Sequence, residues 1–272
     1  MRVAMSYSLG KIRHATAGNA MQKGIANSGD EIVTGGADAW VVFGWAPPAS
    51  EMREAGLPVV TMDMAYFGRL APGSRDGHHK VSVNHWHPTA YFQKVRHKSD
   101  RWESFRLPVF PMRKGGRGHI VVAGSGPKSN LRDGNEFQEW ERWAIGQIAD
   151  ATDRPIIYRP KPYNNQTAQP IAASVMDDKT PILDLLKDAH CVITRQSNVA
   201  IDALRIGVPA FCWDGAASVL SLQDLGLVED PRIPTDEERW QFFSDLAYCQ
   251  WTLAEMETGT AWRHLKDEGL IQ

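Results

Sequence analysis

A polar turn in the second half of the chain has residue types that can bind a phosphate group. The turn follows an apolar run at residues 191–194 and consists of Arg195, Gln196, Ser197 and Asn198. A helical pattern comes next, and the free N–H groups and dipole at a helix start favour an anion such as a diphosphate. Arg195 can add a charge-assisted contact, and Asp202 lies one turn further on. The pattern also fits an ordinary β-α-β unit with a capped helix.

Two other loops have a similar position, each after an apolar run of its own. The first contains Gly124, Ser125, Gly126 and Lys128, and the second contains Arg159 and Lys161. Small residues let backbone approach a ligand closely, and both loops carry cations that suit phosphate. Neither matches a dinucleotide-binding or P-loop motif, so a plain glycine turn and a solvated basic loop stay open as alternatives. The carboxyl ends of parallel strands share one edge of a sheet, where ligands bind.

A basic stretch with interleaved aromatics spans residues 75–117. It has ten Lys or Arg against three Asp or Glu, in a chain of net charge −2. Such a stretch suits contacts with a nucleic-acid backbone and an unstacked base, although a solvated face is the alternative. Candidate acceptor or DNA contacts from it and its flank are Arg69, His85, Lys94, Arg96, Lys98 and Arg101. Four histidines, at 78, 79, 85 and 87, could ligate a metal, but they lack a Cys or clear acidic partner, so we predict no metal site.

The elements that must position these residues form two α/β patterns. In the first half, apolar runs at residues 3–6, 31–34, 39–43, 58–62 and 80–83 predict strands, with a loop at 9–18 and a helix at 19–27. In the second half, strands are predicted at 119–123, 155–158, 191–194 and 209–213, and helices at 135–151, 182–189 and 198–206. Strands that alternate with crossover segments indicate parallel sheets, and the second half predicts a doubly wound unit.

A stretch rich in proline, glycine and cations at residues 108–118 predicts a hinge. The C-terminal segment predicts one long amphipathic helix, because Trp240, Phe243, Ala247 and Trp251 follow at helical spacing. Thr235 and Glu238 form a possible capping box at its start. We therefore expect domains at 1–114 and 115–234, with residues 235–272 packed back on the first domain.

Composition excludes several classes of protein. The chain has 272 residues, of which 43% are apolar and 23% charged, which argues against disorder and against a uniformly basic or acidic protein. No stretch approaches the roughly 20 apolar residues of a membrane helix, and the first residues lack the apolar core of a secretory signal. Three cysteines without a CxxC motif indicate reduced, buried thiols in a cytosolic protein.

The run "VITRQSNVAIDALRIGVPAF", preceded by "PILDLLKDAH" and "YRPKP", resembles the C-terminal half of GT-B glycosyltransferases. It is similar to that of capsule-type transferases and the related nucleotide-sugar epimerases, over roughly residues 119–225. The resemblance implies two Rossmann-like domains that face each other across a cleft, with a nucleotide-diphosphate sugar, most simply a UDP-sugar, as co-substrate and no bound cofactor or metal. It implies that residues 195–198 hold the phosphates and that Asp202, where the family more often has Glu, lies near the ribose.

The N-terminal run "VVFGWAPPASEMREAGLPVVTMDMAYFGR" and the ending "LAYCQWTLAEMETGTAW" are similar to small phage-encoded proteins of glycosyltransferase type. This implies a 5-hydroxymethyl-pyrimidine in double-stranded DNA as the acceptor, in the cytoplasm of an infected bacterium. A capsule-type glycan acceptor, a nucleotide-sugar epimerase and a non-catalytic DNA-binding protein are the alternatives.

A transferase of this kind needs a base that deprotonates the acceptor hydroxyl. Asp63 follows the predicted strand at 58–62, and its apolar neighbours can dehydrate it and raise its pKa. It is the first candidate, and His14, in the loop after the first strand, is the second. A turn residue and a surface histidine are the ordinary alternatives for these two positions.

Overall fold

The computed structural model describes residues 1–272 apart from 45–51, 70–76, 115–117, 133 and 163–166, and without the side chains of Lys128, Leu131 and Arg132. The chain forms two compact units. Unit 1 comprises Met1–Phe105 and Phe243–Gln272, and unit 2 comprises Arg106–Phe242. The chain therefore passes between the units twice. The first passage lies at residues 105–106, just before the stretch predicted as a hinge, and the second lies inside helix α9 (Asp236–Ala247).

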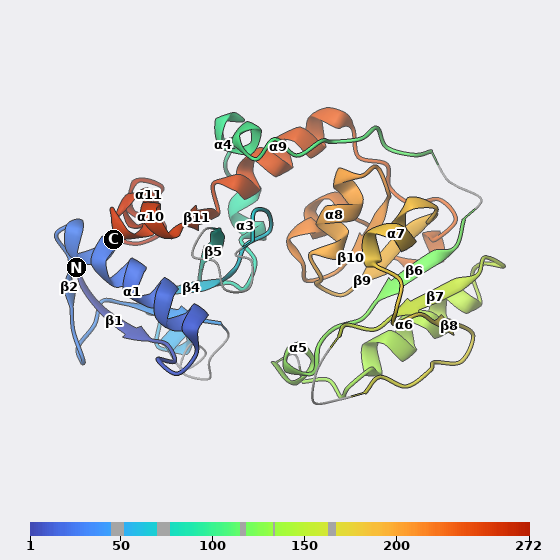
Figure 1. Ribbon diagram of the computed structural model, residues 1–272, viewed down its shortest axis with the longest axis horizontal. Coiled ribbons are helices and arrows are strands. Elements are labelled where there is room, and N and C mark those ends of the chain that lie inside the picture. Colours follow the sequence, from blue (N-terminus) through green and yellow to red (C-terminus); the bar gives the residue numbers. More distant parts are fainter. Residues whose placement is uncertain (45–51, 70–76, 115–117, 133, 163–166) are drawn as a thin grey trace. The chain divides into compact units, whose positions relative to one another are not determined.

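Unit 1 is built on a six-stranded sheet with strand order β11-β5-β4-β3-β1-β2. Figure 1 labels β1, β2, β4, β5 and β11 of this sheet. Its strands are β1 (Arg2–Ser6), β2 (Glu31–Ile32), β3 (Ala39–Phe43), β4 (Val59–Met64), β5 (His78–Val83) and β11 (Gln250–Thr252). The first four are parallel, but β5 runs antiparallel to both β4 and β11. The expectation of a parallel sheet is thus correct for β1 to β4 and wrong for the strand near residue 80.

The helices of unit 1 are α1 (Ile12–Asn27), α3 (Thr89–Phe92), α4 (Asp100–Ser104), α10 (Leu253–Glu257) and α11 (Thr260–Asp267). The core lies between the sheet and α1, where Val60 and Met62 of β4 belong to one cluster with Met21 of α1 and Trp262 of α11. Helices α1 and α10 pack so closely that only glycine fits at position 24. A Cβ on Gly24 would lie 1.8 Å from the Met256 carbonyl oxygen. The C-terminal helices are therefore part of the unit 1 core.

Unit 2 is built on a parallel five-stranded sheet with strand order β10-β9-β6-β7-β8. Its strands are β6 (Ile120–Ala123), β7 (Ile156–Arg159), β8 (Val175–Met176), β9 (Cys191–Thr194) and β10 (Ala210–Cys212). Its helices, besides the start of α9, are α5 (Pro127–Arg132), α6 (Glu139–Ala149), α7 (Ile182–Lys187) and α8 (Val199–Arg205). Three of these strands, β6, β9 and β10, are fully buried and mainly apolar, as parallel strands covered on both faces are.

Three predicted elements differ from those observed. Helix α1 begins at Ile12, so most of the segment predicted as a loop is helical. Helix α6 begins only at Glu139, because Gln138 has a left-handed backbone with φ +63°. The separate short helix α5 ends at Arg132, before the predicted start at residue 135. The single long C-terminal helix is wrong.

In place of that helix, α9 ends at Ala247, and β11, α10 and α11 follow. Trp251 lies in β11, where it pairs with His79 of β5 and is buried. The predicted capping box at the start of α9 is confirmed. The Glu238 amide donates to Thr235 Oγ1 (3.1 Å), and the Thr235 amide donates to Glu238 Oε2 (2.7 Å).

The three cysteines are buried and unpaired, as the sequence predicts. Within the described ranges, the structure contains no helix with the length and apolar character needed to cross a membrane.

Candidate functional site

The sheet of unit 2 has a topological switch point between β6 and β9. From β6 the chain moves outward through β7 and β8, and it then returns to the other side of β6 to form β9 and β10. The loops that follow β6 and β9 therefore diverge at the carboxyl edge, and this is where open α/β sheets bind their ligands. Residues 124–126 and 195–198, both predicted as phosphate-binding, are these two loops.

The loop after β6 is held by a buried carboxylate that sequence reasoning missed. The Ser125 amide donates to Glu141 Oε1 at 2.5 Å, and only 1% of Glu141 is exposed. Burial raises the pKa of Glu141, and the hydrogen bond from Ser125 partly offsets that effect. A Cβ on Gly124 would lie 3.2 Å from the Tyr158 ring and 3.5 Å from Glu141 Oε1, so a small residue suits this position. The sequence places Glu141 inside a predicted helix and contains no signal that its carboxylate is buried.

The loop after β9 is fixed by two hydroxyl groups. Thr194 Oγ1 donates to the Ala123 carbonyl oxygen (2.9 Å) and accepts from the Ser197 amide (3.3 Å). Ser197 Oγ accepts from the Val199 amide (3.3 Å) at the start of α8. Thr194 thereby ties the β9 loop to the end of β6, so the two loops of the switch point form one structure.

Arg195 is oriented by a salt bridge within unit 2. Its Nε lies 2.9 Å from Asp214 Oδ2, and its carbonyl oxygen accepts from the amides of Trp213 and Asp214. The turn back toward Arg195 requires glycine at 215, because a Cβ there would lie 2.6 Å from Cys212 Sγ and 3.1 Å from Gln196 Cα. Gln196 is buried, whereas Ser197, Asn198 and Asp202 are half-buried.

The loop after β7 contributes a lysine to the same edge. Lys161 lies against Gly126, since a Cβ on that glycine would be 3.4 Å from Lys161 Cδ. Arg159 is the last residue of β7 rather than part of the following loop, and it donates to the Pro160 carbonyl oxygen at 3.2 Å. The side chain of Lys128 lies outside the described residues. The structure thus brings residues 124–126, 161 and 195–198 together at one edge.

The sheet of unit 1 has its own switch point, between β1 and β3, because β2 and β3 lie on opposite sides of β1. His14 of α1 stacks on Phe43, the last residue of β3, with ring centroids 4.2 Å apart. The helix that places His14 here replaces the predicted loop. His14, the second candidate base, therefore lies at the switch point of unit 1.

A neighbouring histidine, His79, was not singled out from the sequence as a catalytic candidate. Its ring meets Phe43 edge-on at 6.1 Å between centroids, and only 1% of the residue is exposed. Its Nδ1 is buried without a hydrogen-bond partner in the part of the chain that the structure describes. Burial lowers the pKa of His79 to about 4, so it is neutral at pH 7. The sequence signal for His79 is the histidine pair at 78–79, whose only interpretation there is as possible metal ligands.

Asp63 lies inside β4, not after it as predicted, and its Oδ1 accepts from the Met64 amide at 2.7 Å. Side chains alternate along a strand, and Met62 belongs to the core beneath α1. Asp63 therefore projects to the opposite face, where its strand partner is Lys80. The two candidate bases, Asp63 and His14, thus share the carboxyl edge of unit 1 but lie on different faces of the sheet.

Two cations of the predicted basic stretch, Lys80 and Arg101, form contacts within unit 1. Lys80 is 3% exposed, donates to the Trp86 carbonyl oxygen (2.8 Å) and lies 3.7 Å from the centroid of the Trp86 ring. Arg101 pairs with Glu255 at 2.5 Å and lies 4.1 Å from the centroid of the Trp251 ring. The charge of the stretch is therefore only partly available to an external phosphate.

The other predicted acceptor contacts divide between two ends of the sheet. Arg69 donates to the Ala65 carbonyl oxygen near the carboxyl end of β4. His85, Lys94, Arg96 and Lys98 are exposed. His85 and Lys94 line a cavity of about 270 Å³ together with the last residues of β5. Because β5 is antiparallel, its last residue Val83 pairs with Val60 near the start of β4, so this cavity lies at the end of the sheet opposite to Asp63.

No protein-family model matches the sequence, and no curated protein matches it. Two solved structures from Thermosulfurimonas dismutans share its fold. The KpsC β-Kdo 2,7 transferase is 12% identical, with 95% of this chain and 98% of that chain covered and a TM-score of 0.52. The KpsC β-Kdo 2,4 transferase is also 12% identical, with 91% of each chain covered and a TM-score of 0.51. The predicted fold class, α/β with two Rossmann-like domains, is confirmed.

Proposed function

We propose that the chain is a glycosyltransferase that moves a sugar from a nucleotide-diphosphate donor to an acceptor hydroxyl. The observation that supports it most is the group of loops at the switch point of unit 2, where residues 124–126, 161 and 195–198 converge. This edge combines close-approach glycines with cations, which is the chemistry that a diphosphate needs. The fold shared with transferases over nearly the whole of both chains adds support.

In the proposed reaction, the acceptor oxygen forms a bond to the anomeric carbon while the bond from that carbon to the donor phosphate breaks. The leaving diphosphate gains negative charge, and preorganised donors that face it lower the barrier. Arg195 is the strongest candidate, because its salt bridge with Asp214 already fixes its direction. Lys161 and the amides of the β6 loop are further donors. The hydroxyl proton passes to a base on unit 1.

The structure favours His14 over Asp63 as that base. His14 lies at the switch point of unit 1, whereas Asp63 is one strand away and accepts a hydrogen bond from its own neighbour Met64. Substituting each separately distinguishes them. His14→Ala should abolish transfer and leave donor binding intact, while Asp63→Asn should retain most of the transfer. The reverse result would restore Asp63 as the base.

Two kinds of acceptor fit the proposed transfer. The fold neighbours are named as Kdo transferases, which favours a saccharide hydroxyl. A hydroxymethyl-pyrimidine in DNA rests on the sequence resemblance and on three exposed cations, Lys94, Arg96 and Lys98. If DNA is the acceptor, replacing these three with alanine should reduce the salt dependence of DNA binding by up to about three counterions. An unchanged salt slope would remove DNA from the proposal.

A donor screen tests the activity itself. Nucleoside mono- and diphosphate sugars are incubated with the enzyme and with saccharides, hydroxymethylated DNA or unmodified DNA, and the products are read by mass spectrometry. A mass increase of one glycosyl unit on an acceptor supports transfer. Conversion of the donor alone would indicate an epimerase instead, and donor consumption in no arm would contradict both readings.

A pair of arginine variants tests the location of the donor site. Arg195→Ala should weaken nucleotide-diphosphate affinity by about 10- to 150-fold, because a charge-assisted contact contributes roughly 1.5–3 kcal/mol. Arg154→Ala is the matched control, since Arg154 forms a similar 2.9 Å salt bridge with Glu229 but precedes β7, at the opposite edge of the sheet. Equal losses in both variants, measured by titration calorimetry, would refute the assignment.

A further inference from the structure

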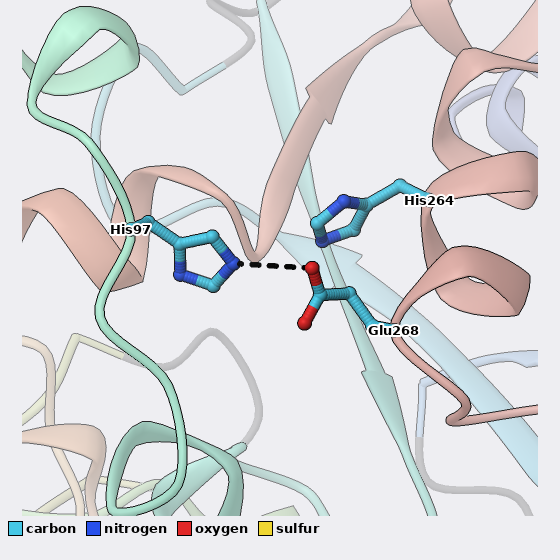
Figure 2. A group of neighbouring side chains, drawn as sticks. All are labelled: His97, His264 and Glu268. Carbon is cyan, nitrogen blue, oxygen red and sulfur yellow. Dashed lines mark ion pairs between the residues drawn. The ribbon is translucent and has the colours of Figure 1, made fainter.

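Three side chains with metal-binding chemistry meet in unit 1, away from the switch points. They are His97, His264 and Glu268, and one ligand atom of each lies within 4.8 Å of the other two (Figure 2). His97 Nε2 and Glu268 Oε1 are 3.9 Å apart. His264 and Glu268 are four residues apart at the end of α11 and so lie on one face of that helix. We propose that these residues form a zinc site that fastens the C-terminal helix to the rest of unit 1.

His97 is held in the way that metal-binding histidines are held. Asp245 Oδ1 accepts from the His97 backbone amide (2.7 Å) and lies 3.1 Å from Nδ1 of the same residue. The ring also stacks on Tyr248, with centroids 4.3 Å apart and an angle of 13° between the planes. A carboxylate at Nδ1 fixes the tautomer that presents the lone pair of Nε2, and this carboxylate–histidine arrangement is typical of zinc ligands.

His264 points its ring toward the Glu268 carboxylate (Figure 2). Its Nε2 is buried and has no hydrogen-bond partner among the described residues. A buried ring nitrogen without a partner forfeits a hydrogen bond that water would supply in the unfolded chain. Coordination to a cation would satisfy this atom.

The cluster offers donor types that zinc accepts. Two imidazole nitrogens and one carboxylate oxygen come together, and Glu268 is exposed, so water can reach the cluster.

Zinc binding requires the three ligand atoms, which lie within 4.8 Å of one another, to draw together. Ligand atoms that each lie about 2.0–2.1 Å from a tetrahedral zinc ion are about 3.4 Å apart. The 3.9 Å between His97 Nε2 and Glu268 Oε1 must therefore shrink by only about 0.5 Å. Tyr91 Oη lies 3.0 Å from His97 Nε2, so this hydroxyl must turn aside when the ion binds. Tyr91 and His264 both line the 270 Å³ cavity, which offers an entry path and room for a water ligand.

The site would stabilise unit 1 and does not depend on the proposed transferase activity. His97 lies between α3 and α4, whereas the other two ligands lie near the C-terminus, so the ion would cross-link distant segments of the chain. Binding to the folded state alone lowers the unfolding equilibrium constant by about 100-fold when free zinc is 100 times its Kd. Chelation would then lower the melting temperature of unit 1.

The test uses the full-length, untagged protein after dialysis against a chelator. Zn²⁺ is titrated in competition with a chromophoric chelator, and we expect one high-affinity ion per chain. Asp245→Asn should weaken zinc binding by about 10- to 100-fold, as loss of a supporting carboxylate does, and Glu268→Gln, which removes a ligand, should weaken it at least as much. His85→Ala is the matched control, since His85 lines the same cavity but is not in the cluster. Its zinc affinity should match that of the wild type.

Cobalt substitution gives a readout that does not depend on stability. Co²⁺ in a site of four ligands absorbs visible light far more strongly than hexahydrated Co²⁺, and Glu268→Gln should lose this band while the chain keeps its circular dichroism. Absence of stoichiometric zinc binding in the wild type would overturn the proposal. Equal weakening of zinc binding in His85→Ala and Glu268→Gln would also overturn it, because it would indicate binding to surface histidines.

Discussion

The buried Glu141 gives a sharp test of how the proposed donor site is held in place. Replacing it with alanine removes the acceptor of the Ser125 amide, which belongs to a residue only 7% exposed. A buried donor left without a partner costs about 1–3 kcal/mol. If this cost falls on the loop, the Ser125 amide should open to solvent about 5- to 150-fold more often. Hydrogen exchange of that amide under native conditions measures the change directly.

Two further variants separate the hydrogen bond from the charge. Glu141→Gln keeps an acceptor oxygen and removes a buried charge, so Ser125 should stay protected. Burial raises the pKa of Glu141 in the folded chain. The contribution of Glu141 to the free energy of unfolding is therefore greatest at low pH, and it falls as pH rises through this folded-state pKa. The glutamine variant should therefore be at least as stable as the wild type at pH 7. Glu139→Ala, which removes an exposed acceptor of the Glu136 amide, is the control. Unchanged exchange at Ser125 in Glu141→Ala would refute the reasoning.

Other predictions concern His79 and Gly215. The pKa of His79 is about 4 in the folded chain against an ordinary 6.5, so the unfolded state takes up the proton first as pH falls. When pH falls from 7 to 4, the unfolding free energy of the wild type should therefore decrease by about 3 kcal/mol more than that of His79→Phe. Denaturant titration measures both decreases, and equal decreases would contradict a buried neutral imidazole. Gly215→Ala drives a Cβ against Gln196 backbone and should cost about 1–3 kcal/mol and weaken nucleotide affinity. Gly146→Ala is the control, because a Cβ on this helical glycine meets open space, and it should stabilise the chain by about 0.4–1 kcal/mol. Similar effects of Gly215→Ala and Gly146→Ala would contradict the packing argument.

Three strands of unit 2, β6, β9 and β10, are predictable from the sequence because they are buried on both faces. The run at residues 191–194 is continuous and apolar, and it is observed as β9 with the same bounds. The C-terminal segment was not predictable in this way. Trp251 falls at helical spacing from Trp240 and Ala247, but its place is set by pairing with β5, and no local pattern encodes that contact between distant segments.

The candidate site was predictable where residues that can bind a phosphate directly follow the end of a strand. Residues 124–126 and 195–198 were found from small, polar and basic types after apolar runs. Glu141 and His79 were missed because burial, not residue type, makes them unusual, and burial depends on tertiary packing. The proposed zinc ligands are likewise far apart in the sequence, and His97 was only one of several histidines in a basic stretch.

The central claim is that a nucleotide diphosphate binds at the switch point of the second sheet. Amide hydrogen exchange with and without saturating UDP, and with other nucleoside diphosphates in turn, tests it most directly. The account predicts that protection increases at residues 124–126 and 196–198 and not at the opposite edge near Arg154. Protection confined to other segments, or no change with any nucleotide, would contradict it.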